Sequence, residues 1–242
     1  MIRVDSLLYK IDQKLNKLST NDHQQIPLED KILALNEAQI KLIKRKVSGT
    51  ATTSGLGLDA FRKRYEDLQV LVVDYSKPLD LELSDKNLNQ YNADLTKLSP
   101  KYLFYIDSYI LADKGRCKDR KIWVNKDLAK HSDISLLLNN ENYKPSFEYQ
   151  ETFNTIADNK LAIYTDGTFT PKKIFVSYLR YPQYINKSGY VDLEGNETPD
   201  QDCELADYLE DELVDLTVQD LAEYTENASA VQSAQFRIQT SE

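Results

Sequence analysis

Apolar side chains in the first seventy residues recur with the three- and four-residue spacing of amphipathic helices. One stripe predicts a first helix: Leu8, Ile11, Leu15 and Leu18. A second helix is predicted from near Pro27, because proline is tolerated in a first turn. Its stripe is broad: Leu28, Ile32, Leu35, Leu42, Ile43 and Val47. A third stripe predicts one more helix: Leu58, Phe61, Tyr65 and Leu68.

Beyond residue 71 the spacing changes to that of β-strands. Runs rich in aromatic and β-branched residues predict short strands: 102–107, 121–125 and 190–193. A helical patch around 128–138 interrupts them. The clearest local signal is Asp166-Gly167, which lies between apolar runs at 161–164 and 174–179. Because such a dipeptide readily adopts positive φ angles, this segment predicts a β-hairpin.

The end of the chain returns to helical spacing. Two adjacent stripes give the last helix a wide apolar face: Leu205, Leu209, Leu213 and Leu216, with Val214, Val218 and Leu221 beside them. Asp200 or Asp202 precedes this helix and is predicted to cap its N-terminus. After Glu226 the residues become small and polar, which is typical of a tail.

Together these elements predict an α+β protein, in which a helical bundle from the N- and C-terminal segments carries an inserted β-rich subdomain. The expected parts are helical residues 1–70, a β-rich insertion at 71–200, a bundle-completing helix at 201–226 and a polar tail at 227–242. Four leucines are expected to pack inside the bundle: Leu209, Leu213, Leu216 and Leu221. A length of 242 residues suits one large domain or one domain with an insertion.

Composition narrows the classes of function. The net charge of −9 disfavours a protein that grips nucleic acid by neutralising phosphates. The 16 tyrosines favour surfaces that are buried against a partner yet stay soluble. Cys117 and Cys203 form no CxxC pattern, so neither a disulfide framework nor a zinc site is indicated. Without a signal peptide or a long apolar run, we expect a soluble protein made in the cytoplasm, with no membrane partner.

Catalytic and metal-binding patterns do not stand out. His23 and His131 lie at no ligand spacing from a cysteine or a second histidine. The glycine-containing loop at 54–59 lacks the lysine and the preceding strand of a phosphate-binding loop. An EF-hand count from Asp192 places Glu197 where that loop requires glycine. We therefore expect no enzymatic activity and no cofactor.

The run from Tyr178 to Tyr184 has two open interpretations. As a strand it places Tyr178 and Arg180 on one face and Leu179 and Tyr181 on the other, and it simply closes a small sheet. As a contact patch it supplies the residue types that anchor protein interfaces. The candidate contact residues are Tyr178, Arg180, Tyr181 and Tyr184, with Phe236 from the tail.

The last helix also carries a run of acidic side chains between its apolar positions: Glu210, Asp211, Glu212 and Asp215. The simpler interpretation is a solvated helix face. In a ring of several copies the same residues would form an acidic wall, which repels phosphates and keeps DNA mobile.

Five blocks of the sequence carry a resemblance to a known family: 35–39, 42–45, 176–182, 203–205 and 212–218. This layout resembles the head–tail connector, or ring (adaptor), proteins of crAss-like and related tailed bacteriophages. The resemblance implies a virion structural protein, made in the bacterial host and located at the head–tail junction. It implies a ring of twelve copies that docks under the portal protein, contacts the next tail ring protein and lets genomic DNA pass without sequence-specific binding.

Three alternatives stay open from the sequence. The first is another ring or stopper layer of the virion tail. The second is an acidic protein that mimics DNA and inhibits a DNA-binding enzyme in a 1:1 complex. The third is a hydrolase that uses Asp107 and Asp113 as paired carboxylates.

Overall fold

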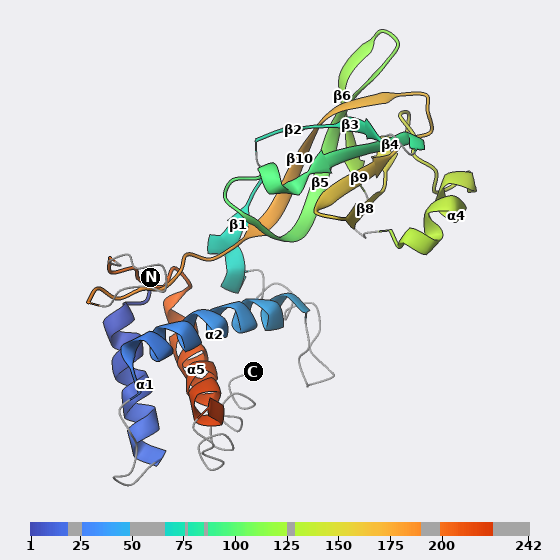
Figure 1. Ribbon diagram of the computed structural model, residues 1–242. Helices are drawn as coiled ribbons and strands as arrows, with labels where there is room; N and C mark the ends of the chain where they lie inside the picture. Colours follow the sequence, from blue (N-terminus) through green and yellow to red (C-terminus); the bar gives the residue numbers. More distant parts are fainter. Residues whose placement is uncertain are drawn as a thin grey trace. The chain divides into compact units, whose positions relative to one another are not determined.

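Figure 1 shows the computed structural model of the chain, which has both helices and sheets, so the predicted α+β class is confirmed. The structure describes these residues: 1–18, 26–48, 66–75, 77–84, 87–124, 129–189 and 199–224. The chain divides into two compact units. The helical unit contains Met1–Val70 and Pro182–Glu242, and the β unit contains Leu71–Tyr181.

Three long helices form the described part of the helical unit: α1 (Val4–Leu18), α2 (Leu28–Ser48) and α5 (Glu210–Tyr224). Helix α5 contacts both α1 and α2. Its wide apolar face permits this, and Leu209 just before the helix, Leu213, Leu216 and Leu221 are all buried. The predicted third helix lies largely outside the described residues, which include only its helical end at 66–68.

The buried stripe of α1 differs from the predicted one. Val4, Leu7 and Ile11 are buried, whereas Leu8 and Leu15 are only half-buried. Ile11 belongs to both stripes, and the observed one reaches it through Val4 and Leu7 instead of Leu8, because helical neighbours recur at both three and four residues. In α2 the predicted Ile32, Leu35, Leu42 and Ile43 are buried.

The second boundary of the insertion was predicted too late, at 200 instead of 181. The segment from Pro182 returns to the helical unit because Asn36 on α2 binds its backbone. The Asn36 side chain donates to the carbonyl of Ile185 (2.9 Å) and accepts from the N–H of the same residue (2.8 Å). Ile185 itself is fully buried, so the amide pair and the apolar side chain together fix this return.

The predicted capping of the last helix by Asp200 or Asp202 is wrong. Asp202 instead accepts a hydrogen bond from the N–H of Val4 (2.9 Å), at the start of α1. Asp200 accepts from the N–H of Ser188 (2.6 Å). A carboxylate therefore satisfies the first turn of the N-terminal helix from a position 198 residues away, while α5 follows a 3₁₀ turn at Asp207–Leu209.

The two cysteines lie in different units and are both free. Cys117 is exposed at the start of a strand, whereas Cys203 is buried, and the amide of Gln39 donates to its sulfur (3.7 Å). Burial raises the pKa of the Cys203 thiol to about 11, because a desolvated thiolate is unfavourable. Cys203 is therefore an inert packing residue.

The β unit consists of two sheets. The six-stranded sheet contains β1 (Val72–Val73), β10 (Thr170–Arg180), β5 (Tyr102–Lys114), β6 (Cys117–Val124) and β7 (Glu151–Thr152) in this order, with β2 (Leu79–Asp80) also paired to β10. The four-stranded sheet contains β3 (Glu82–Ser84), β4 (Asn87–Asp94), β9 (Lys160–Tyr164) and β8 (Asn154–Ala157). Helix α4 (Ile134–Asn139) follows a 3₁₀ turn and overlaps the predicted helical patch.

One apolar core joins the inner faces of the two sheets. Ile110, Ile122 and Val176 of the six-stranded sheet belong to the same buried cluster as Leu161 and Ile163 of the four-stranded sheet. Strand residues alternate between faces, so the neighbouring positions point outward. Each sheet therefore presents one outer face, and the two outer faces differ in chemistry.

The predicted hairpin at Asp166-Gly167 is wrong. Strand β9 pairs with β4 and β8, whereas β10 pairs with β1, β2 and β5 in the other sheet. The carboxylate of Asp166 accepts hydrogen bonds from the backbone and the hydroxyl of Thr168, which turns the chain from one sheet to the other. The tight hairpin is at Asp158-Asn159, where both residues have positive φ and β8 meets β9.

The strand predicted at 190–193 lies outside the described residues, and so does the tail at 227–242. The two strands predicted at 102–107 and 121–125 coincide with parts of β5 and β6. Among the described helices, none is long and apolar enough to span a membrane.

Candidate functional site

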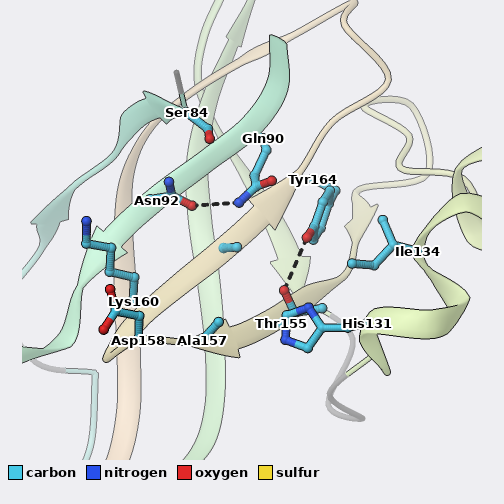
Figure 2. Close-up of a pocket in the computed structure, with 11 residues that line it drawn as sticks. Ser84, Gln90, Asn92, His131, Ile134, Thr155, Ala157, Asp158, Lys160 and Tyr164 are labelled. Atoms are coloured by element: carbon cyan, nitrogen blue, oxygen red, sulfur yellow. Dashed lines mark hydrogen bonds between the residues drawn. The ribbon is translucent and has the colours of Figure 1, made fainter. Parts of the chain in front are cut away.

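The outer face of the four-stranded sheet is polar and forms a pocket of about 470 Å³. Figure 2 shows that its lining side chains come from neighbouring strands and from the segment around α4. Gln90 and Asn92 lie on β4, Lys160 and Tyr164 on β9, and Thr155 on β8. These positions share one face because strand side chains alternate with a period of two.

Hydrogen bonds within the pocket hold its polar groups in place. The amide of Gln90 donates to the side-chain oxygen of Asn92 (3.0 Å), and the hydroxyls of Thr155 and Tyr164 lie 3.2 Å apart. The ring of Tyr164 also stacks on Phe153, with ring centroids 4.9 Å apart. The pocket therefore presents amides and hydroxyls whose orientations are set by the protein.

One wall and one end of the pocket come from other elements. Ile134 at the start of α4 lines the wall and packs with a small apolar cluster that includes Ala162 and Tyr164. His131 also lines the pocket, and its Nε2 lies 3.3 Å from the carbonyl oxygen of Ile156. The sequence showed no pattern around this histidine, but the structure places it at the edge of a pocket.

The outer face of the six-stranded sheet is aromatic. Four rings form the aromatic surface, which we define as Tyr75, Tyr109, Trp123 and Phe175. Tyr109 is central: its ring stacks on Phe175 (centroids 4.7 Å apart) and meets Tyr75 and Trp123 edge-on (4.9 and 5.8 Å). Trp123 is 44% exposed, so a large ring in this cluster is open to a partner.

A single cation lies over three of these rings. The ammonium of Lys121 is 3.9 Å from the ring centroid of Tyr109, 3.8 Å from that of Trp123 and 5.6 Å from that of Tyr75. The Tyr75 hydroxyl in turn donates to Asp107 (3.5 Å). Burial, together with the negative charge of Asp107, raises the pKa of Tyr75. These contacts order an outward-facing cluster before any partner binds.

The structure separates the residues of the predicted contact patch. Tyr178 lies in the β-unit core with no exposed surface, and its hydroxyl donates to the carbonyl of Pro100 (2.6 Å), so its assignment as a contact residue is wrong. Bulges in β10 on either side of Tyr178 and Leu179 break the expected alternation, and both side chains are buried.

The remaining candidates have different surroundings. Arg180 is half-buried and donates to the carbonyl of Tyr181 (3.2 Å). Tyr181 is exposed at the end of the β unit, and the ammonium of Lys101 lies 4.9 Å from its ring centroid. Tyr184 is exposed too, but it belongs to the helical unit. Phe236 lies outside the described residues. Of the described candidates, Tyr181 and Tyr184 are the exposed ones, and they belong to different units.

The solvated-face interpretation of the acidic run in the last helix holds only for Asp211, whose side chain is 75% exposed, whereas Glu210, Glu212 and Asp215 are largely shielded. The carboxylates of this run bind lysines of α1 and α2, in these pairs: Lys10 with Glu210 and Asp211, Lys14 with Asp215, and Lys46 with Glu212. The hydrogen bond to Glu210 raises the pKa of Lys10, and the one from Lys10 lowers that of Asp211. These charges hold the helices together, because most of them are largely shielded from water.

The proposed carboxylate pair does not come together. Asp107 and Asp113 lie six residues apart on β5, so at about 3.4 Å per residue they are separated by roughly 20 Å. Asp113 instead binds Lys172 and Lys118 and accepts from the N–H of Asp119. These contacts lower the pKa of Asp113 to about 2. No group of three potential metal ligands occurs among the described residues.

Charge is distributed unevenly between the units. Residues 71–181 contain 16 Lys and Arg against 15 Asp and Glu, whereas the rest of the chain contains 14 against 24. The helical unit therefore carries the whole net negative charge. The β unit is close to neutral, and its aromatic surface contains the cation of Lys121.

Sequence reasoning missed both outer faces of the β unit. The alternation at 121–124 holds a signal that could have found one of them, since it places Lys121 and Trp123 on the opposite face from Ile122 and Val124. No comparable local signal marks the pocket, because its residues come from four strands and α4. A scan against protein-family models matches no family, and a search of curated proteins finds no match.

Proposed function

We propose that this chain is a virion structural protein, a subunit of a head–tail connector ring that docks under the portal and continues the DNA channel. The aromatic surface carries the proposal. Tryptophan and tyrosine are the residues that most often anchor protein interfaces, and here they form an ordered, outward-facing cluster around Lys121. A surface of this kind is suited to contact with a neighbouring protein subunit.

The occupant that we assign to the aromatic surface is the helical unit of a second copy. A ring requires two different faces on each subunit, because its interfaces are heterologous. The two units of this chain differ in charge, with the helical unit acidic and the aromatic surface cationic at Lys121. This complementarity supports association between unlike units of neighbouring copies.

The blocks that carry the family resemblance add support. Residues 35–39 and 42–45 lie on α2, residues 212–218 lie on α5, and these two helices pack against each other. Block 176–182, by contrast, lies largely on β10 of the β unit. The blocks on α2 and α5 thus correspond to the core of the helical unit. They are the part of a ring subunit that maintains its own fold, whereas the aromatic surface provides the contact.

The test measures the mass of the full chain, alone and mixed with the portal protein, by native mass spectrometry and negative-stain electron microscopy. We expect rings in at least one of the two samples. Trp123→Ser should abolish them, whereas Tyr149→Ser, which changes an aromatic side chain that is 83% exposed, should leave them intact. A wild-type chain that stays monomeric in both samples, or Trp123→Ser rings like those of the wild type, would contradict the proposal.

The same samples separate the ring layers. Rings that bind the portal protein directly support the connector position. Rings that bind only a tail protein place the chain in a lower layer of the tail, and a 1:1 complex with a basic DNA-binding enzyme supports DNA mimicry instead.

A further inference from the structure

We propose that the polar pocket on the four-stranded sheet binds a neutral, polyhydroxylated ligand of the saccharide class. The pocket lies on a different face from the aromatic surface, so this inference does not depend on the ring proposal. Its volume of about 470 Å³ falls within the roughly 300–1,000 Å³ of ligand sites.

The two amides of β4 supply the recognition chemistry. A carboxamide offers two N–H donors and a carbonyl acceptor, which together match the donor and acceptor roles of adjacent sugar hydroxyls. Gln90 uses one N–H to bind the oxygen of Asn92. No described residue binds the Gln90 oxygen or the Asn92 amide nitrogen, so one acceptor and one donor stay available at the pocket.

The floor of the pocket is a small residue between polar ones. In the sheet, Ala162 pairs with Asn92 on one side and with Thr155 on the other. Its methyl group leaves depth between the Asn92 amide and the Thr155 and Tyr164 hydroxyls. A ligand that enters this space would therefore meet the Gln90 and Asn92 amides on one side and an apolar floor, while the Thr155 and Tyr164 hydroxyls on the other side bind each other and are nearly buried.

The charges at the rim favour a neutral ligand. Asp158 and Lys160 both line the pocket: Asp158 lies in the tight turn between β8 and β9, and Lys160 is the first residue after it. Their charges are opposite, so the rim favours neither an anion, such as a phosphate, nor a cation. The apolar wall of Ile134 provides surface for the C–H groups of a sugar ring.

The experiment titrates the full chain with a panel of neutral mono- and disaccharides. Saturation-transfer NMR identifies the binders, calorimetry gives Kd, and inorganic phosphate serves as the anionic probe. We expect at least one saccharide to bind and phosphate not to bind. A panel without a binder, or phosphate binding that competes with the saccharide, would overturn the inference.

Variants locate the site. Asn92→Ala removes the free donor and should raise the saccharide Kd about tenfold, the effect of losing roughly 1.4 kcal/mol. Ala162→Phe should fill the floor and abolish binding. The control is Asn139→Ala, an exposed amide at the end of α4 outside the pocket, which should bind like the wild type.

The fluorescence of the single tryptophan verifies folding of each variant, because Trp123 lies in the β unit. Folded Asn92→Ala and Ala162→Phe proteins that keep the wild-type Kd would place the saccharide elsewhere and would overturn the assignment. Ring formation is measured on the same variants. Unchanged rings together with lost saccharide binding show that the two proposals succeed or fail separately.

Discussion

The lysines between the helices of the helical unit and Lys121 of the β unit have different kinds of partner. In the helical unit, lysines of α1 and α2 bind carboxylates of α5, and these pairs lie between the helices. In the β unit, Lys121 lies over the rings of Tyr109 and Trp123 on an outer face. The lysine–carboxylate pairs of the helical unit therefore stabilise the packing of its helices. In the β unit, the Lys121 ammonium and the aromatic rings face outward.

Sequence separation explains part of this difference. Lys10 and Asp211 are 201 residues apart, so their contact forms only when both ends of the chain have come together. Lys121 and Trp123 are neighbours on one strand, and β6 pairs with the adjacent β5. A surface built from neighbouring strands is complete within the β unit, and it remains open to a partner.

The largest effect that we predict tests whether the units are independent. Leu213→Ala in the helical unit and Ile110→Ala in the β unit each remove a fully buried side chain. Each should lower the free energy of unfolding by about 2–5 kcal/mol. Tryptophan fluorescence follows the β unit, since Trp123 is the only tryptophan, and far-ultraviolet circular dichroism follows the helices.

If the units unfold separately, Leu213→Ala shifts the dichroism transition and leaves the fluorescence transition in place. Ile110→Ala shifts the fluorescence transition. Equal shifts of both signals in both variants would mean that the chain unfolds as one cooperative body, and the comparison would lose its basis.

The next effect concerns the charge pairs of the helical unit. Lys46 lies 2.8 Å from Glu212 and 3.6 Å from Asp67, and Asp67 is only 2% exposed. Lys46→Met leaves these carboxylates without their cation, so the unfolding free energy should fall by about 3 kcal/mol. Urea denaturation followed by circular dichroism measures it. Lys44→Met, on an exposed position of the same helix, should change stability little.

A smaller effect is expected at the aromatic surface. Lys121→Met removes the cation above the rings and should cost about 0.5–1 kcal/mol, because such contacts are weak where water reaches them. The emission of Trp123 should change as well, since the ammonium lies over its ring. Lys97→Met, at an exposed lysine away from the rings, is the control, and equal effects of the two variants would contradict the stacking.

The smallest effect is a pH dependence of the β unit. Bonds to Lys172, to the Asp119 N–H and to Lys118 lower the pKa of Asp113 to about 2 from an ordinary value of 3.8. A depressed pKa stabilises the fold above about pH 4, and this contribution is lost as the pH falls through about 2. Fluorescence-detected urea midpoints should show this loss between pH 4 and 2. Asp113→Asn should remove that part of the pH dependence, and an unchanged profile would refute it.

Local patterns predicted much of the fold. The spacing of Ile32, Leu35, Leu42 and Ile43 identified α2 and its buried face, because a helix repeats within a few residues. The same logic failed at Asp166-Gly167, where the dipeptide permits a hairpin but the partners of β9 and β10 lie elsewhere in the chain. It failed again at Tyr178, where bulges changed which face is buried.

By itself, the sequence determined the three long helices and the positions of β5, β6, β9 and β10, since helix and strand periodicities depend on neighbours a few residues apart. Only the tertiary structure decided which strands share a sheet and which lysine meets which carboxylate. It also decided that Trp123 faces outward in a ring cluster and that Gln90, Asn92 and Thr155 share a pocket. These features depend on contacts between distant segments, whose free energy appears only when the whole core assembles.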